Sequence, residues 1–253
     1  TLIQNQLRTF QKGCPPTFDL RGASIGNLIL AGGYLNQNKQ LEPIIFLVAK
    51  LVGVLGHVKA VSDDNLHLAA KLETGDIVVG QHLLTGKEQA PLTSPIEEIF
   101  LNRSWQSREP AVSVFPERNT ALVQSADLIC YSPGSLYTSL IASLLPRGVG
   151  RAVASRTVPK VYVPSLGHDP EAPGMTLEDR VQALLAYLRK DAGSDCPAER
   201  LLNFVVTDKR TEEDDIGAVE QLGITVLRLD LISSKSDPYY DPVPLCEALV
   251  SLT

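Results

Sequence analysis

The spacing of apolar residues predicts helices in the first part of the chain. From Gly22 onward, small and apolar residues recur every three or four positions through the sequence GASIGNLILAGGYLN, and the same periodicity returns over residues 40–52. Such spacing gives a helix one apolar face. Two helices that face a core are therefore expected before residue 53.

The pattern then changes to short apolar runs, which are typical of strands. The apolar runs at 66–72 and 77–84 are separated by Glu-Thr-Gly-Asp at 73–76, a sequence that is typical of a hairpin turn. Together the runs predict a small antiparallel insertion over about residues 57–101, with strands at 57–61, 66–72, 77–84 and 96–101.

The rest of the chain alternates between β-branched apolar runs and segments with helical periodicity. Expected strands lie at 126–131, 160–163, 202–207 and 224–229. Expected helices lie at 117–124, from 135 onward, and at 150–155, 176–188 and 244–252. Continuous apolar strands that alternate with helices favour a parallel sheet covered on both faces, and hence the α/β class.

Composition and charge narrow the classes of function. The 253 residues include 23 Lys and Arg against 29 Asp and Glu, a formal charge of −6, which argues against a nucleic-acid partner. With 44% hydrophobic residues and no long linker, one domain over residues 1–253 is expected. The chain begins with Thr rather than Met, which is consistent with a trimmed or processed N-terminus.

No membrane segment or secretion signal is expected from the sequence. The longest apolar stretch, at 44–56, is interrupted by Lys50 and is too short to cross a bilayer. The four cysteines form no Cys-x-x-Cys pair, which suits a reducing compartment, so a cytoplasmic protein is expected.

Three segments are candidates for ligand chemistry. In the first, an apolar strand runs through Pro133, Gly134 and Ser135 into a helix whose first turn also carries Thr138. At the carboxyl end of a parallel strand, this turn could offer free backbone N–H groups to a phosphate. The alternative is a serine-capped helix after a tight turn, without a ligand.

The second candidate lies at the start of the first expected helix. Gly22 and Gly26 leave one face bare, while Asn27 could offer its amide to a ligand. Close helix packing over small residues is the alternative. The third candidate follows the strand at 160–163, where His168, Asp169 and Glu171 could hold a metal or orient a ligand, or could be solvated loop residues.

A set of motifs, in this order, resembles the CofD family, which contains 2-phospho-L-lactate transferase and gluconeogenesis-factor-like proteins. The motifs are RGASIGNLILA at 21–31, VLGHV at 54–58, ADLI at 126–129 and PGSLYTS at 133–139. Family members normally begin with a strand and a glycine-rich loop, followed by an aspartate that serves the metal. Residues 1–18 contain nothing similar. Residues 165–171 also differ from the Asn and Thr-Gln-Pro-Gly-Glu-Thr run that is usual there.

The resemblance implies a Rossmann-like three-layer α/β/α fold with a mostly parallel sheet, and a nucleoside-diphosphate-type ligand in a cleft at the strand ends. It implies magnesium as cofactor, held with help from Asp169 or His168, and leaves a homo-oligomer open. Three functions stay open: a transferase of a phospho-linked group, a non-catalytic nucleotide-sugar-binding regulator, and a scaffold with a decayed site. The implied ligand residues are Gly22, Ser24, Gly26, Asn27, Pro133, Gly134, Ser135, Tyr137 and Thr138.

Overall fold

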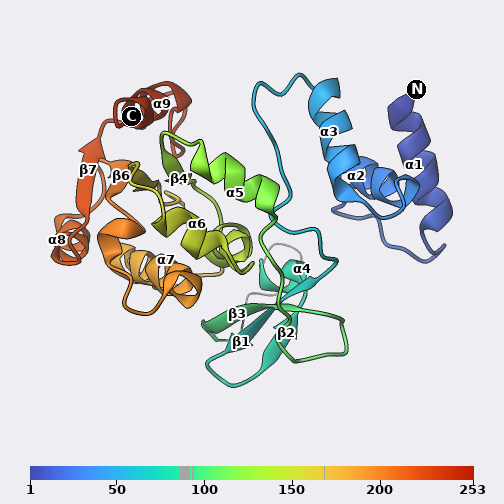
Figure 1. The fold of residues 1–253 in the computed structure, drawn as a ribbon, viewed down its shortest axis with the longest axis horizontal. Coiled ribbons are helices and arrows are strands. Elements are labelled where there is room, and N and C mark those ends of the chain that lie inside the picture. Colours follow the sequence, from blue (N-terminus) through green and yellow to red (C-terminus); the bar gives the residue numbers. More distant parts are fainter. Residues whose placement is uncertain (86–91, 93, 168) are drawn as a thin grey trace. The chain divides into compact units, whose positions relative to one another are not determined.

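The structure is a computed structural model that describes residues 1–85, 92, 94–167 and 169–253. The chain divides into two compact units, Thr1–Asp63 and Asp64–Thr253, and each is described by itself. Figure 1 shows the helices and strands of both units. The expected single domain over residues 1–253 stays a prediction.

The first unit consists of helices. These are α1 (Leu2–Gly13), α2 (Ile25–Asn36) and α3 (Leu41–Leu51), and the last two confirm the periodicity of the sequence. The helix α1 was not expected, because its sequence is rich in Gln and polar residues. It begins at Thr1, whose side chain accepts a hydrogen bond from the Gln4 backbone in a capping box.

Two adjacent glycines allow α2 to pack against both of its neighbours. A Cβ atom added to Gly32 would lie 1.9 Å from the backbone oxygen of Gln6 on α1. One added to Gly33 would lie 2.2 Å from the side chain of Ile44 on α3. Because real Cβ atoms never come so close, these helix contacts require glycine at both positions.

The second unit begins with a small antiparallel sheet in the order β2-β1-β3. Its strands are β1 (His67–Leu72), β2 (Ile77–Val79) and β3 (Ile96–Asn102), which confirms the expected β insertion in type. Its expected boundaries were partly wrong. Residues 57–61 form no strand and are mostly exposed, and β2 stops before Gly80, whose φ of +113° is incompatible with a regular strand. The short helix α4 (Gln81–Leu84) follows.

A parallel sheet forms the centre of the second unit. Its strands are β4 (Ile129–Tyr131), β5 (Lys160–Tyr162), β6 (Phe204–Asp208) and β7 (Thr225–Leu229), in the order β4-β5-β6-β7. All three neighbouring pairs are parallel. The strand order follows the chain order, so each connection leads to the adjacent strand.

Helices connect and cover these strands. They are α5 (Glu117–Gln124), α6 (Val149–Ala154), α7 (Leu177–Ala192), α8 (Glu213–Gln221), α9 (Pro242–Val250), a π-helical segment at Leu136–Leu140, and 3₁₀ turns at Ile141–Leu144 and Ala198–Arg200. Helix α8 was not predicted, because its first turn is acidic and few apolar residues mark its buried side.

The sheet separates two layers of helices, as the Rossmann-like prediction requires. On one face, Val161 of β5 and Val206 of β6 form a fully buried core against Leu245 and Leu249 of α9. The helices α6 and α7 pack together on the other side (Figure 1). Right-handed connections between successive parallel strands place the connecting helices on one face. Helix α9 connects no strands, and it covers the opposite face.

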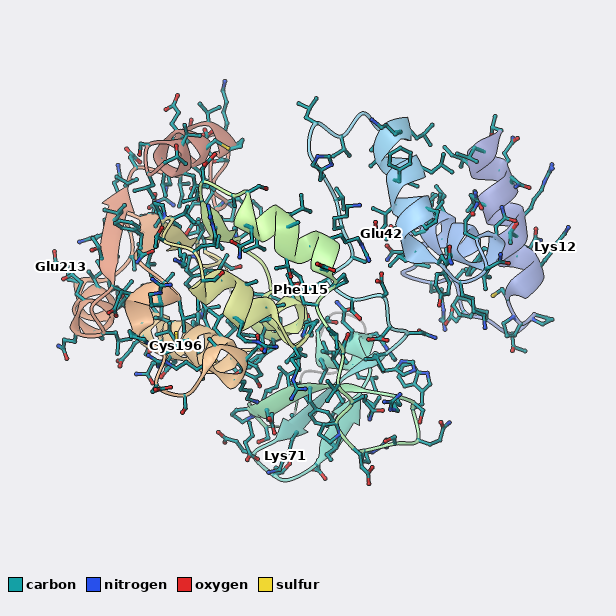
Figure 2. All side chains as sticks on the ribbon, in the orientation of Figure 1. Lys12, Glu42, Lys71, Phe115, Cys196 and Glu213 are labelled. Carbon is teal, nitrogen blue, oxygen red and sulfur yellow. The ribbon has the colours of Figure 1, made fainter. Side chains whose placement is uncertain are left out.

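Charged side chains of both units extend into solvent. Figure 2 shows Lys12 in the last turn of α1, Lys71 on β1 and Glu213 at the start of α8. No helix in the described part of the chain combines the length and the apolar composition needed to cross a bilayer.

Replacement of Gly32 by alanine tests the packing of the first unit. We expect Gly32→Ala to destabilise the unit by about 1–3 kcal/mol, since the new methyl group must displace the α1 backbone. The matched control is Gly26→Ala in the same helix, where the added atom lies 3.5 Å from Ser24 Oγ and nothing closer. Urea unfolding of both variants gives the comparison; equal stability of the two would contradict the packing described.

Candidate functional site

The Pro133-Gly134-Ser135 turn connects β4 to the π-helical segment and lies against the loop that follows β5. The backbone N–H of Gly134 donates to Ser165 Oγ at 2.9 Å, and the Ser165 hydroxyl donates to the Gly134 carbonyl at 2.8 Å. The carboxyl ends of adjacent parallel strands therefore meet here, at the edge where α/β sheets bind ligands.

Two buried carboxylates hold the helix that begins after this turn. Asp169 Oδ2 accepts the backbone N–H of Leu136 at 2.7 Å, and Glu171 Oε2 accepts that of Thr138 at 2.8 Å. The hydroxyl of Thr138 also donates to Glu171. Asp169 is 5% exposed and Glu171 1%. The free donors of the first helical turn are thus satisfied by the chain's own acids.

The second oxygen of Asp169 stabilises the loop itself. Asp169 Oδ1 accepts the backbone N–H of Glu171 at 3.1 Å, so both carboxylate oxygens are engaged by backbone donors. Burial raises the pKa of Glu171 above its usual 4.5, while the hydrogen bonds from Thr138 act in the opposite direction and the charge of Asp169 adds to the rise.

A cavity of about 560 Å³ opens beside the turn. The turn and the loop after β5 form one wall, and the segment that leads into α9 forms the other. Its lining consists of Pro133, Gly134, Ser135, Ser165, Leu166, Gly167, Asp169, Pro170, Tyr239, Tyr240, Pro242 and Leu245. Most of these groups are apolar or aromatic, and among the described lining residues Asp169 carries the formal charge.

Two tyrosines in the wall, Tyr239 and Tyr240, were not among the residues expected at the site. Tyr240 donates its hydroxyl to the Pro164 carbonyl at 2.9 Å, and burial raises the pKa of Tyr240 to about 12. Tyr239 is 72% exposed at the cavity. A pair of aromatic residues within a polar loop was the available signal.

The other residues expected around this turn face elsewhere. Thr138 is buried, with its hydroxyl on Glu171. Tyr137 is buried and lines a separate cavity of about 430 Å³ with Ile96 and Glu171. The structure therefore brings Pro133, Gly134 and Ser135 together at one cavity. Tyr137 and Thr138 do not line this cavity.

The glycine-asparagine segment lies in the first unit, at the start of α2. Gly22, Ser24, Gly26 and Asn27 are all exposed. Ser24 is the N-cap residue but makes no side-chain capping hydrogen bond. Within this unit the close helix packing involves Gly32 and Gly33 rather than Gly22 and Gly26. A common cavity for Asn27 and Ser135 stays a prediction.

The donor set does not provide a ready magnesium site. Within residues 1–85, 92, 94–167 and 169–253, no group of three or more His, Cys, Asp or Glu side chains is arranged to hold a metal ion. Asp169 already serves two backbone donors, and His168 lies outside the described residues. The described residues therefore do not fit the expected metal, and magnesium binding stays a prediction.

Comparison with known proteins identifies the family. The family model described as "2-phospho-L-lactate transferase CofD" matches residues 4–237. The chain belongs to the CofD family. This confirms the resemblance seen in the motifs, and the match extends to α1, beyond the part of the chain that suggested it.

Curated relatives carry the name of a gluconeogenesis factor. The Bacillus subtilis gluconeogenesis factor is 28% identical over 227 residues, which are 87% of this chain and 68% of that protein. A Thermotoga maritima protein with a provisional assignment of the same name is 30% identical over 197 residues, or 78% of this chain. The chain spans about 55% of the length of the Thermotoga relative.

A solved structure has the same fold. The crystal structure of a UPF0052 family member from Bacillus halodurans matches with a TM-score of 0.72 at 21% identity. The match covers 90% of this chain and 72% of that one. At this identity the likeness concerns the fold, and it confirms the Rossmann-like α/β assignment.

The buried Glu171 gives the turn a testable dependence on pH. Since its pKa is raised in the folded state, its contribution to stability is complete below the unfolded value of about 4.5 and is lost as pH rises through the folded pKa. The Glu171→Gln variant keeps an acceptor for Thr138 but no charge. We expect the stability of Glu171→Gln relative to the natural protein to increase with pH across that window.

Urea unfolding at a series of pH values measures this difference. Glu178→Gln on α7 serves as control, because Glu178 accepts a hydrogen bond from Gln182 on the helix surface and not from the turn. A constant offset between the Glu171→Gln and natural profiles would contradict the assigned role of burial.

Proposed function

We propose that this chain binds a nucleoside-diphosphate-type ligand in the cavity beside the Pro133-Gly134-Ser135 turn, as a regulator of the gluconeogenesis-factor kind. The observation that carries the proposal is the cavity itself, which lies at the carboxyl ends of β4 and β5 and joins a glycine turn to an aromatic wall. Relatives named gluconeogenesis factor support the regulatory role.

The lining suits the planar and sugar parts of such a ligand. Tyr239 presents an exposed ring on which a base can stack, and each stacked base contributes about 1–3 kcal/mol. Gly134 has no side chain, so a ligand can approach its backbone closely. Ser135, which is half-buried at the end of the turn, offers a hydroxyl to a phosphate oxygen.

The charge of the cavity favours binding without turnover. Transfer of a phosphorus-containing group needs cationic groups or metal ions that neutralise the developing charge on the leaving phosphates. Among the lining residues that the structure describes there is no Lys or Arg, and Asp169 is acidic. Ring stacking and neutral hydrogen bonds can still hold a ligand in its ground state.

The Gly134→Val variant tests the location of the ligand. We expect at least a tenfold loss of affinity, about 1.4 kcal/mol, because the valine side chain occupies the approach to the turn. Folding should survive, since the first added atom lies 3.4 Å from Ser139 Cβ, an ordinary contact. Calorimetric titration with ADP, GDP and UDP, together with thermal melts, measures both quantities.

The matched control is Gly217→Val in α8, where an added Cβ meets nothing within 4 Å. This variant should bind as the natural chain does. Unchanged affinity in a folded Gly134→Val protein would remove the turn from the site.

Transfer of a phospho-linked group to an acceptor hydroxyl is the second candidate, favoured by the family model that matches residues 4–237. We expect binding to persist while turnover is at least about a hundredfold below a usual rate of 1 per second, because loss of charge stabilisation costs about 3 kcal/mol or more. Incubation with magnesium and nucleoside diphosphate conjugates, followed by calorimetry and mass spectrometry, tests this. Turnover at about 1 per second would favour the transferase, and absence of any binding would favour a scaffold.

A further inference from the structure

A second cavity, of about 420 Å³, lies on the other side of the loop that follows β5. Ser165 and Leu166 line both cavities, so this loop separates them. The second cavity also lies at the carboxyl ends of strands, here β5 and β6, and α7 and α8 begin at its walls. The proposed nucleotide site does not include this second cavity.

Arg180, on α7, is a cation without a counterion in this cavity. In the described part of the chain, no carboxylate forms an ion pair with it, and its Nε is buried without a hydrogen-bond partner. Its Nη1 makes one long hydrogen bond, of 3.5 Å, to the Ser165 carbonyl. A half-buried guanidinium with unused donors is a favourable partner for a phosphate group.

The second arginine of the cavity behaves differently. Arg210 lies 3.1 Å from the Asp237 carboxylate and 3.7 Å from that of Asp208, so internal acids neutralise its charge. The contrast makes Arg180 the group whose charge is available to a ligand. Arg210 instead holds the segment that precedes α9.

Hydrogen-bond acceptors line the same cavity as this charge. Glu212 and Asp215 line it, at and after the N-cap of α8. Glu213, which follows Glu212, extends outward (Figure 2). Its carboxylate lies 3.4 Å from Arg228 Nη1. Carboxylates repel a bare anion but accept hydrogen bonds from hydroxyl groups, so the cavity combines one cationic donor with acidic acceptors.

We propose that this cavity binds a phosphorylated small molecule with free hydroxyl groups, whose phosphate contacts Arg180 and whose hydroxyls face Glu212 and Asp215. The ligand class follows from the two kinds of group that the cavity offers. The site goes beyond the proposed nucleotide function and does not depend on it, because the residues that carry it do not line the cavity beside Gly134.

Calorimetric titration with ribose 5-phosphate, inorganic phosphate and ribose tests the site. We expect ribose 5-phosphate to bind more tightly than phosphate, and ribose not to bind. Arg180→Gln should weaken ribose 5-phosphate at least tenfold, and Arg180→Lys, which keeps the charge but not the fork of donors, should weaken it less. Arg189→Gln is the matched control on the same helix, since Arg189 donates to the Cys196 carbonyl outside the cavity.

Three results of this titration would overturn the proposal. They are equal binding by Arg180→Gln in a protein with unchanged circular dichroism, equal binding of ribose and ribose 5-phosphate, and no binding of ribose 5-phosphate to the natural chain. Tyr239→Ala separates this site from the nucleotide cavity. It should weaken nucleotides and leave ribose 5-phosphate unaffected; loss of ribose 5-phosphate binding in this variant would place the sugar phosphate in the other cavity and also overturn the proposal.

Discussion

The candidate site depends on two buried carboxylates that join the ends of neighbouring strands. Asp169 and Glu171 come from the loop after β5, and they accept the backbone N–H groups of Leu136 and Thr138 after β4. Hydrogen bonds to charged groups contribute about 1.5–3 kcal/mol each, and more would be lost if the carboxylates remained buried without these donors. The turn that contains Gly134 therefore has a fixed position relative to β5.

This arrangement also determines where negative charge can be accepted. A helix start after a glycine turn usually attracts anions, but here the chain supplies the anions itself. Arg180, which forms no ion pair with any residue that the structure describes, lines the second cavity together with Ser165 and Leu166. The two cavities at this edge of the sheet therefore differ in lining: one is mostly apolar and aromatic with the acid Asp169, and the other contains Arg180.

The sequence predicted the helices and strands that contain continuous or periodic apolar residues. It did not predict the helices that consist mostly of polar residues. All four parallel strands and the helices between β4 and β6 follow β-branched or periodic segments, whereas α1 and α8 are polar enough to resemble loops. The expected strand at 57–61 has a strand-like composition but no partner in the unit that contains it. Hydrophobic pattern identifies elements that bury a face, and it cannot identify partners.

The same limit applies to the site. The meeting of Gly134 with Ser165 could be predicted, because adjacent parallel strands end at one edge. The role of Glu171 could not, since a hydrogen bond to Thr138 spans 33 positions and depends on the path of the loop. Tyr239 was missed for a related reason: its neighbour at the cavity, the turn after β4, is about a hundred residues away in the chain.

The loop between β5 and α7 has little freedom in length. Its two acids are two positions apart, and so are the backbone donors at Leu136 and Thr138 that they meet. An insertion of one residue between Asp169 and Glu171 would change the spacing of the two carboxylates but not that of the two N–H groups. One buried carboxylate would then lose its backbone donor and face a carbonyl or a side chain. Homologous chains that keep the two acids should therefore keep their spacing as well, and length variation should be confined to surface turns such as the one at 193–197.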